Sequence, residues 1–257
     1  MQDTLIIPSY NRIDTPVVLP THSEHMHIVV QVGAQVVLHD LVDPSANRTV
    51  TMVIEDNAHV TFLHDRVASQ NVREHYSVDI GRASSLVYYS LLTDTNELQL
   101  HMNLKGEYAQ ADVRCAWLLK EHAQVAMQVN QNHYVPHTTS RLDIRTVLYD
   151  AAQAEYQGGI FIAPGAHQTD AAQQHKSIVL SSQARAISVP TIEVLAHDVQ
   201  CAHGSAVGQI DEEQLLYMQS RGLSQLAAKH MWLRGFFADV FNDSLLFIRL
   251  QNLLKMP

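Results

Sequence analysis

Short alternating runs of apolar residues recur through most of the 257-residue chain, and this repetition constrains the fold more than any other feature. The runs are rich in Val, Ile, Leu and Tyr and lie at residues 27–32, 34–41, 49–55, 59–64, 85–92, 112–119, 124–129, 159–164, 176–181 and 191–196. Alternation of apolar and polar residues over short runs predicts β-strands. The region from about residue 26 to residue 208 is therefore predicted to be all-β.

Turn phrases that contain an alanine separate many of these runs. They are centred on Ala34, Ala58, Ala83, Ala123, Ala152, Ala166 and Ala184. The first two intervals are 24 and 25 residues, and later ones include 14 and 29. A strand-turn unit repeated in this way favours stacked coils, and we expect a parallel β-helix. A jelly roll or cupin-like double sheet is the competing architecture, because it also uses many short strands with frequent turns.

The two ends of the chain differ from this repeat. Residues 1–25 contain three prolines and are expected to form an extended segment. Residues 209–257 are predicted to form a small helical domain of three helices. The first begins with acidic residues and ends near Gly222, the second can be capped by Ser224, and the third can start at residues 242–244.

Charge and cysteine content exclude several classes of protein. The chain has 17 Lys and Arg against 26 Asp and Glu, a net charge of −9, so it lacks the basic surface that binds nucleic acid. No apolar run reaches the roughly 18–20 residues of a membrane span, and the first residues do not resemble a signal peptide. Two cysteines far apart do not form a disulfide framework, which favours a reducing compartment, the cytoplasm.

Sequence motifs of self-contained enzymes are missing. The chain has no phosphate-binding glycine loop, no Gly-x-Ser-x-Gly elbow, no His-Glu-x-x-His helix and no Cys-x-x-Cys pair. Histidine is abundant, with 16 residues, and His25 and His27 would share one face of a strand beside Glu24. This spacing occurs in cupin-type metal sites, but a polar, partly exposed strand entrance is the favoured explanation, and no matching second cluster follows.

Each cysteine has its own expected environment. Cys115 lies in an alternating run and is predicted to be a buried core residue. Cys201 lies two residues before His203, at the end of the β region. If this stretch is extended, both side chains point to the same side, about 7 Å apart at the backbone. Two ligands are too few for a closed metal site, so a second chain would have to supply the others. A packed Cys201 without a ligand role is the alternative.

The predicted tail helices carry more large apolar residues than one buried stripe requires. Trp232, Phe236, Phe237 and Phe241 are among them. Many of these side chains are expected to pack on each other and on the β region. A surface helix buries about three residues in seven, so part of the surplus is expected to meet a partner protein.

Several motifs in the second half of the chain resemble, in order and spacing, those of the SufB/SufD family of iron–sulfur cluster assembly proteins. The matching segments are 134–138, 147–151, 168–171, 180–182, 190–193, 198–204, 206–212 and 217–222. The phrase Cys201-Ala-His203-Gly204 before the helical tail is most similar to the SufD branch. The resemblance covers residues 130–225 and, more loosely, the β region before them.

The resemblance implies a right-handed parallel β-helix with a C-terminal helical domain. It also implies a non-catalytic SufD-like scaffold that pairs with a SufB-like subunit through the β-helix and binds the SufC ABC-type ATPase through its tail. Carried over by motif, Cys201 and His203 would be ligands of iron or of a transient iron–sulfur cluster at the subunit interface, with none tightly bound in the isolated chain. ATP hydrolysis would reside in SufC.

The same resemblance assigns the tail to partner binding. Its residues that match the family are Asp211, Glu212, Tyr217, Arg221 and Gly222, and the apolar candidates for the docking surface are Trp232, Phe236 and Phe237. SufD proteins usually carry a helical domain before the β-helix, and this chain instead enters strands within about 25 residues of Met1. Two alternatives stay open: a SufB-like homodimer with SufC, and a cupin-type mononuclear metal enzyme that uses His25 and His27.

Overall fold

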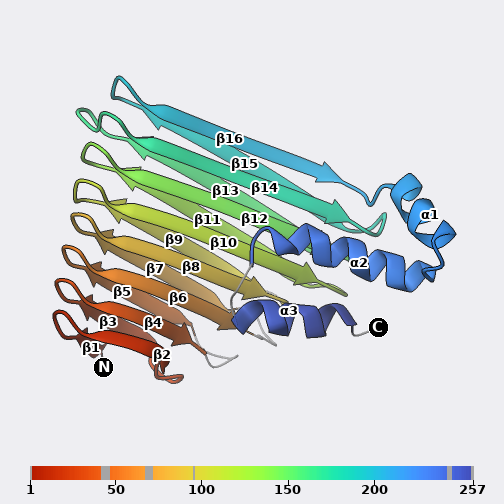
Figure 1. The fold of residues 1–257 in the computed structure, drawn as a ribbon, viewed down its shortest axis with the longest axis horizontal. Helices are drawn as coiled ribbons and strands as arrows, with labels where there is room; N and C mark the ends of the chain where they lie inside the picture. The colour runs from red at the N-terminus through yellow and green to blue at the C-terminus, as the bar shows by residue number, and fades with distance from the viewer. Residues whose placement is uncertain (1, 42–46, 67–71, 95, 242–244, 256–257) are drawn as a thin grey trace.

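Sixteen β-strands and three helices make up the computed structural model, which describes residues 2–41, 47–66, 72–94, 96–241 and 245–255 (Figure 1). The odd-numbered strands form one eight-stranded sheet, here the odd sheet: β1 Gln2–Ile7, β3 His25–Val30, β5 Arg48–Ile54, β7 Arg73–Ile80, β9 Asn96–Leu104, β11 Gln124–His133, β13 Gln153–Ile162 and β15 Arg185–Val194. The even sheet contains β2 Arg12–Val18, β4 Gln35–Asp40, β6 His59–Arg66, β8 Ser85–Leu92, β10 Gln110–Leu119, β12 Thr139–Leu148, β14 Asp170–Val179 and β16 Gln200–Gly208.

The chain alternates between the two sheets, so each pair of strands forms one coil of a solenoid. Every neighbouring strand pair in the described sheets is parallel. This arrangement is the predicted right-handed parallel β-helix, and it excludes the jelly-roll alternative, whose neighbouring strands run antiparallel. The segment 1–25, expected to be extended, contributes β1 and β2 to the first coil.

The hydrophobic core lies between the two sheets. Inward positions alternate with outward ones along each strand, as in β3, where Met26, Ile28 and Val30 are buried. Trp117 of β10 is the largest side chain that is fully buried there. The same alternation produced the apolar periodicity of the sequence.

Tight turns stack along the edge where each odd strand leads into the next even strand. One residue of each turn has a left-handed backbone conformation: Tyr10, Gly33, Asn57, Ala83, Tyr108, His137, Gln168 and Asp198. In most turns a small buried residue follows it: Ala34, Ala58, Ser84, Ala109, Thr138 and Thr169. Successive turns are joined by backbone hydrogen bonds, such as Asn57 N–H to the Arg82 carbonyl at 2.8 Å. Ala34 and Ala58 of the sequence repeat thus lie at inner corners of the coils. Ala83 differs, because it is itself the residue with the left-handed backbone conformation.

Three helices follow β16: α1 Glu212–Ser220, α2 Gln225–Ala238 and α3 Leu245–Lys255. The predicted caps are confirmed at two positions: Gly222 follows α1 with φ of 95°, and Ser224 accepts a hydrogen bond from the Ala227 N–H. Asp211 caps the start of α1 by accepting a hydrogen bond from the Glu213 N–H. The predicted start of the third helix, at residues 242–244, lies outside the described residues.

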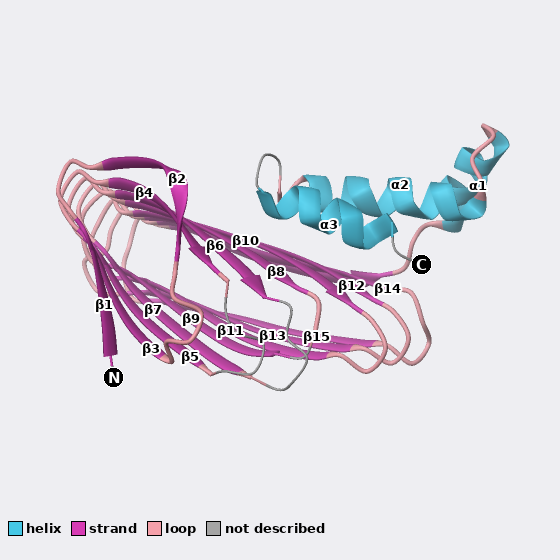
Figure 2. Cartoon of the chain, turned by 90° about the horizontal axis from the view of Figure 1, so that it is seen from below, coloured by secondary structure: helices cyan, strands magenta, loops and turns pink. Residues whose placement is uncertain are grey.

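The helices α2 and α3 pack on the outer face of the even sheet (Figure 2). Leu233, Phe237 and Leu250 are buried against sheet residues such as Leu118 and Val147. Two ion pairs join the same elements. Arg145 of β12 lies 3.7 Å from Asp239, at the C-terminal end of α2, and Arg249 of α3 pairs with Asp65 of β6. Packing on the β-helix therefore accounts for a large share of the apolar tail residues.

Candidate functional site

The last coil places the two predicted ligands on one side of β16. Cys201 is in register with Ala171 and His203 with Gln173, and both of those β14 residues are buried inside the β-helix. Because β16 ends its sheet, this inner side belongs to the open end of the solenoid (Figure 1). The extended conformation assumed in the sequence analysis is confirmed, and with it the shared direction of Cys201 and His203.

Cys201 and His203 differ in exposure. Cys201 is half-buried and packs on the small apolar cluster that includes Ile160, Ile162 and Ala171. Burial and the nearby Asp170 raise the pKa of its thiol, so the thiol is protonated at neutral pH and a metal ion would have to displace that proton. His203 is exposed. The two candidate ligands thus differ: the Cys201 side chain is partly packed, and the His203 side chain is open to solvent.

The open end also presents apolar side chains and unpaired strand edges. Val189, Val194 and Leu195 on or next to β15 are 48%, 38% and 51% exposed, and Val207 on β16 is 53% exposed. Each strand is the last of its sheet within the described chain. We call this region, β15 and β16 with their exposed side chains, the open-end surface. Unpaired edges with apolar side chains commonly pair with another chain.

A groove of about 460 Å³ approaches β16 from its outer face. Ala202, His203 and Gly204 line one end of it. The charged side chains that line it are Arg114, Arg141, Asp112, Asp143 and Asp239. Arg114 pairs with Asp112 at 2.7 Å and Arg141 pairs with Asp170, so the groove has no excess of positive charge. Because it lines this groove, His203 is accessible to solvent also from the outer face of the even sheet.

The predicted partner-binding residues of α1 fall into two groups. Asp211 and Gly222 cap the ends of the helix, which is a structural role. Glu212, Tyr217 and Arg221 are exposed. The Arg221 guanidinium lies 5.3 Å from the centre of the Tyr217 ring, so these two side chains form a cation–π pair on the surface.

The three aromatic candidates of α2 are not equally accessible. Trp232 and Phe236 are partly buried and stacked at 5.6 Å, and Trp232 donates a hydrogen bond to Gln214. Phe237 is completely buried in the core beneath the helix. A charge at Phe237 would therefore disturb packing, and position 237 is unsuitable for probing a docking surface.

Other apolar side chains on the tail are exposed, and the sequence reasoning did not single them out as docking residues. They are Leu216, Leu226, Met231 and Ile248, between 54% and 68% exposed. Met231 and Phe247 also line an apolar groove of about 660 Å³ between α2 and α3. We call these four exposed side chains together with this groove the tail surface. The sequence shows apolar residues at helical spacing, but it does not show how each helix lies on the sheet. That orientation decides which apolar side chains are buried and which are exposed.

The histidine cluster at the start of β3 does not assemble a cupin-type centre. His25 and His27 share the outer face of β3, as predicted from their spacing, and the Nδ1 atom of His27 lies 3.0 Å from the Thr51 hydroxyl. Among the residues that the structure describes, no group of three or more His, Cys, Asp and Glu side chains is arranged to hold a metal ion. The parallel topology also differs from that of a cupin.

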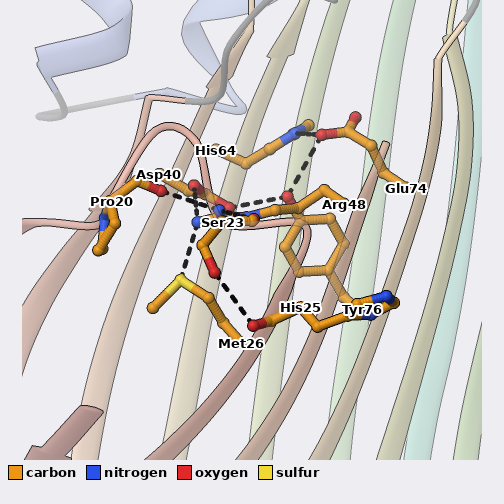
Figure 3. Close-up of polar contacts among 9 residues, drawn as sticks. All are labelled: Pro20, Ser23, His25, Met26, Asp40, Arg48, His64, Glu74 and Tyr76. Atoms are coloured by element: carbon orange, nitrogen blue, oxygen red, sulfur yellow. Dashed lines mark hydrogen bonds and ion pairs between the residues drawn. The ribbon is translucent and has the colours of Figure 1, made fainter. Parts of the chain in front are cut away.

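A buried ionic cluster inside the first coils was not anticipated from the sequence (Figure 3). Arg48 pairs with Asp40 at 2.8 Å, and the Tyr76 hydroxyl donates to the same carboxylate at 2.9 Å. Glu74 lies 3.1 Å from His64. Burial raises the pKa of Asp40, while Arg48 and His64 oppose this shift. Buried charges require such partners, because an isolated buried charge is very costly.

Further buried polar groups lie along the same interior. His133 contacts Thr138 and Ser140, each at 2.8 Å, and burial lowers its pKa to about 4. His175 contacts Thr146 at 3.0 Å, and burial lowers its pKa to about 4. Cys115 is fully buried as predicted, and burial raises the pKa of its thiol far above the usual range. These neutral groups are parts of the core.

In the described part of the chain, none of the helices combines the length and the apolar character needed to cross a membrane.

Comparison with known proteins identifies the family. The family model for the SufBD core domain of SUF system FeS cluster assembly matches residues 14–236. Similar curated proteins include SufD of Escherichia coli, 34% identical over 96 residues (37% of this chain and 23% of that protein), and a SufBD family protein of Synechocystis sp., 29% identical over 122 residues (48% and 26%). A SufBD family protein of Mycobacterium leprae is 28% identical over 215 residues (79% and 52%).

The chain thus spans about half or less of the length of these relatives. The match of the core model nevertheless covers most of the chain and extends from β2 through most of α2. It agrees with the parallel β-helix and the helical tail described above. The chain therefore belongs to the SufBD family of iron–sulfur cluster assembly proteins.

Proposed function

We propose that this chain is a SufD-like scaffold subunit of an iron–sulfur cluster assembly complex. It pairs with a SufB-like subunit through the open-end surface and binds a SufC-like ATPase through the tail surface. Iron or a nascent cluster is the cargo, ATP hydrolysis belongs to the ATPase, and the reducing cytoplasm is the expected compartment. The observation that carries this proposal is the placement of Cys201 and His203 on the same side of β16, at the open end.

The geometry of the open end supports a shared site. Thiolate and imidazole are both good ligands of iron, and two ligands from one chain leave room for two from a partner. The partly packed Cys201 gives the half-site a fixed position, and His203 extends toward the partner. A site divided between two subunits can open and close when the subunits move.

The tail surface supports the second interface. It lies on helices that are packed on the even sheet, so a force applied to the helices is transmitted to the β-helix through Arg145 and Arg249. If two ATPase subunits dimerise on binding ATP, the two attached tails move together. This motion would expose the shared site to iron or sulfide.

Mixing the purified chain with the SufB-like and SufC-like proteins of the same organism tests the proposal. The expected result is one defined complex that contains all three proteins, measured by native mass spectrometry. Absence of binding to both proteins would contradict the scaffold role. A tight homodimer that binds only the ATPase would favour the SufB-like alternative.

The ligand role is tested in the reconstituted complex. His203→Ala is expected to reduce the yield of assembled cluster while the complex still forms. Ser205→Ala is the matched control, because Ser205 is an exposed residue two positions further along the same side of β16. Equal cluster yields from wild type and His203→Ala would contradict the ligand role.

A further inference from the structure

Two histidines meet on the outer face of the odd sheet, the face that the helices leave uncovered (Figure 2). His75 on β7 is in register with Gln99, and His101 on β9 is in register with Ser77, so the two histidines are diagonal neighbours on adjacent strands. Their ring centres are 5.1 Å apart, with 48° between the ring planes. Both side chains are half-buried. This separation allows one metal ion to lie between the two rings.

Each imidazole has a side-chain amide at its Nδ1 atom. The His75 Nδ1 lies 3.3 Å from the Gln99 Oε1, and the His101 Nδ1 lies 3.1 Å from the amide nitrogen of Asn130. The oxygen and nitrogen of the Asn130 amide exchange places by rotation of the group, so it too can accept from an Nδ1–H. In protein metal sites the second ring nitrogen of a ligating histidine usually donates to such an oxygen.

The Nε2 atoms of His75 and His101 are available to bind a metal ion. Within the described ranges of the chain, neither Nε2 takes part in a hydrogen bond. A neutral imidazole carries a lone pair on one ring nitrogen, and this is the form that binds metals.

We propose that His75 and His101 form a two-histidine site for a divalent first-row transition-metal ion, with water as the remaining ligands. Imidazole nitrogen suits Zn²⁺, Fe²⁺, Co²⁺, Ni²⁺ and Cu²⁺ better than Ca²⁺ or Mg²⁺. The site lies on the odd sheet, whereas Cys201 and His203 belong to the even sheet. It is therefore a second position at which this chain holds a metal, independent of the proposed cluster site.

Equilibrium dialysis of the full chain against Zn²⁺ tests the site, with Cys201→Ser and His203→Asn introduced together to remove the other candidate ligands. His75→Asn and His101→Asn are each expected to remove the same single equivalent of bound Zn²⁺. The double substitution is expected to remove no more than either one alone. His27→Asn is the matched control, because His27 lies on the same face and is paired with Thr51.

Unchanged Zn²⁺ stoichiometry and affinity in either variant would overturn the site, as would an equal loss in the His27 control. Electron paramagnetic resonance of bound Cu²⁺ gives an independent readout, since two nitrogen ligands are expected in the wild type and one in each variant. Circular dichroism checks that the variants remain folded. Complex formation with SufB-like and SufC-like proteins is measured separately, so failure of that interaction leaves this test intact.

Discussion

The guanidinium of Arg48 donates a hydrogen bond of 2.8 Å to the carboxylate of Asp40, and both side chains are completely buried. Arg48 also donates to the carbonyl oxygens of Pro20 and Ser23, and Asp40 accepts from the Tyr76 hydroxyl (Figure 3). The pair thereby links the chain segment before β3 with β4, β5 and β7. One ion pair holds together several coils at the N-terminal end of the β-helix.

Replacing Arg48 with Met is predicted to destabilise the protein by about 3–5 kcal/mol, because it leaves the Asp40 carboxylate buried without its counter-ion. Urea denaturation measures this change in the free energy of unfolding. Arg73→Met is the control. The ion pair between Arg73 and Glu97 is largely exposed, and such pairs contribute about 1 kcal/mol or less. Similar losses in the two variants would contradict a special role of the buried pair.

Stability is predicted to fall as the pH decreases from about 6.5 toward 5. Burial lowers the pKa of His133 and of His175 to about 4, below the value near 6.5 expected in the unfolded chain. Between these values the unfolded state binds more protons than the native state, so acidification favours unfolding. Each histidine contributes a slope approaching about 1.4 kcal/mol per pH unit.

His175→Gln is expected to reduce this slope by the contribution of one group, whatever the stability of the variant at pH 7. Urea denaturation at several pH values measures the slope. His122→Gln, at an exposed turn position, serves as the control and is expected to leave it unchanged. An identical pH dependence in the His175 variant and the wild type would show that burial of His175 does not govern acid sensitivity.

Gly158→Ala is predicted to destabilise the β-helix by about 1–3 kcal/mol. An added Cβ at Gly158 would lie 2.0 Å from the Tyr156 hydroxyl and 2.2 Å from the Gln173 amide oxygen, which are themselves joined by a buried hydrogen bond of 2.6 Å. Gly208→Ala is expected to change the thermal unfolding midpoint little, because nothing lies within 4 Å of its added Cβ. A thermal scan that ranks the two variants equally would contradict this explanation.

Met231→Glu is predicted to weaken binding of the SufC-like ATPase without changing the fold. Met231 is exposed and lies beside the apolar groove of the tail surface. Phe237→Glu is expected to destabilise the tail as well, because Phe237 is completely buried. Affinity is measured by surface plasmon resonance, and folding by circular dichroism. Normal binding by a folded Met231→Glu variant would place the docking surface elsewhere.

The list of apolar runs lacks six strands, β1, β2, β7, β9, β12 and β16, and polar residues at inward positions explain this for β7 and β12. In β7 the inward Glu74 belongs to the ionic cluster, and in β12 Ser140 and Thr146 bind interior histidines. In β9 the inward residues are apolar except for Asn96, so this strand was overlooked although its alternation is present in the sequence. β16 lacks the apolar signal because it ends the solenoid, and its inner side faces no further coil. Alternation of apolar and polar residues identifies strands whose inward residues are apolar. Strands with polar inward residues therefore cannot be recognised by this pattern.

The sequence by itself determined the coil repeat, the helix caps at Gly222 and Ser224 and the shared direction of Cys201 and His203, since all three follow from short-range periodicity and local hydrogen bonding. Family motifs added the identity. The tertiary structure alone decided that Arg48 meets Asp40, that His75 meets His101, and that Phe237 is buried while Met231 is exposed. These relationships depend on the register between coils and on how the helices pack on the sheet. Because the coils differ in length, the sequence spacing alone does not fix which residues of neighbouring coils are paired.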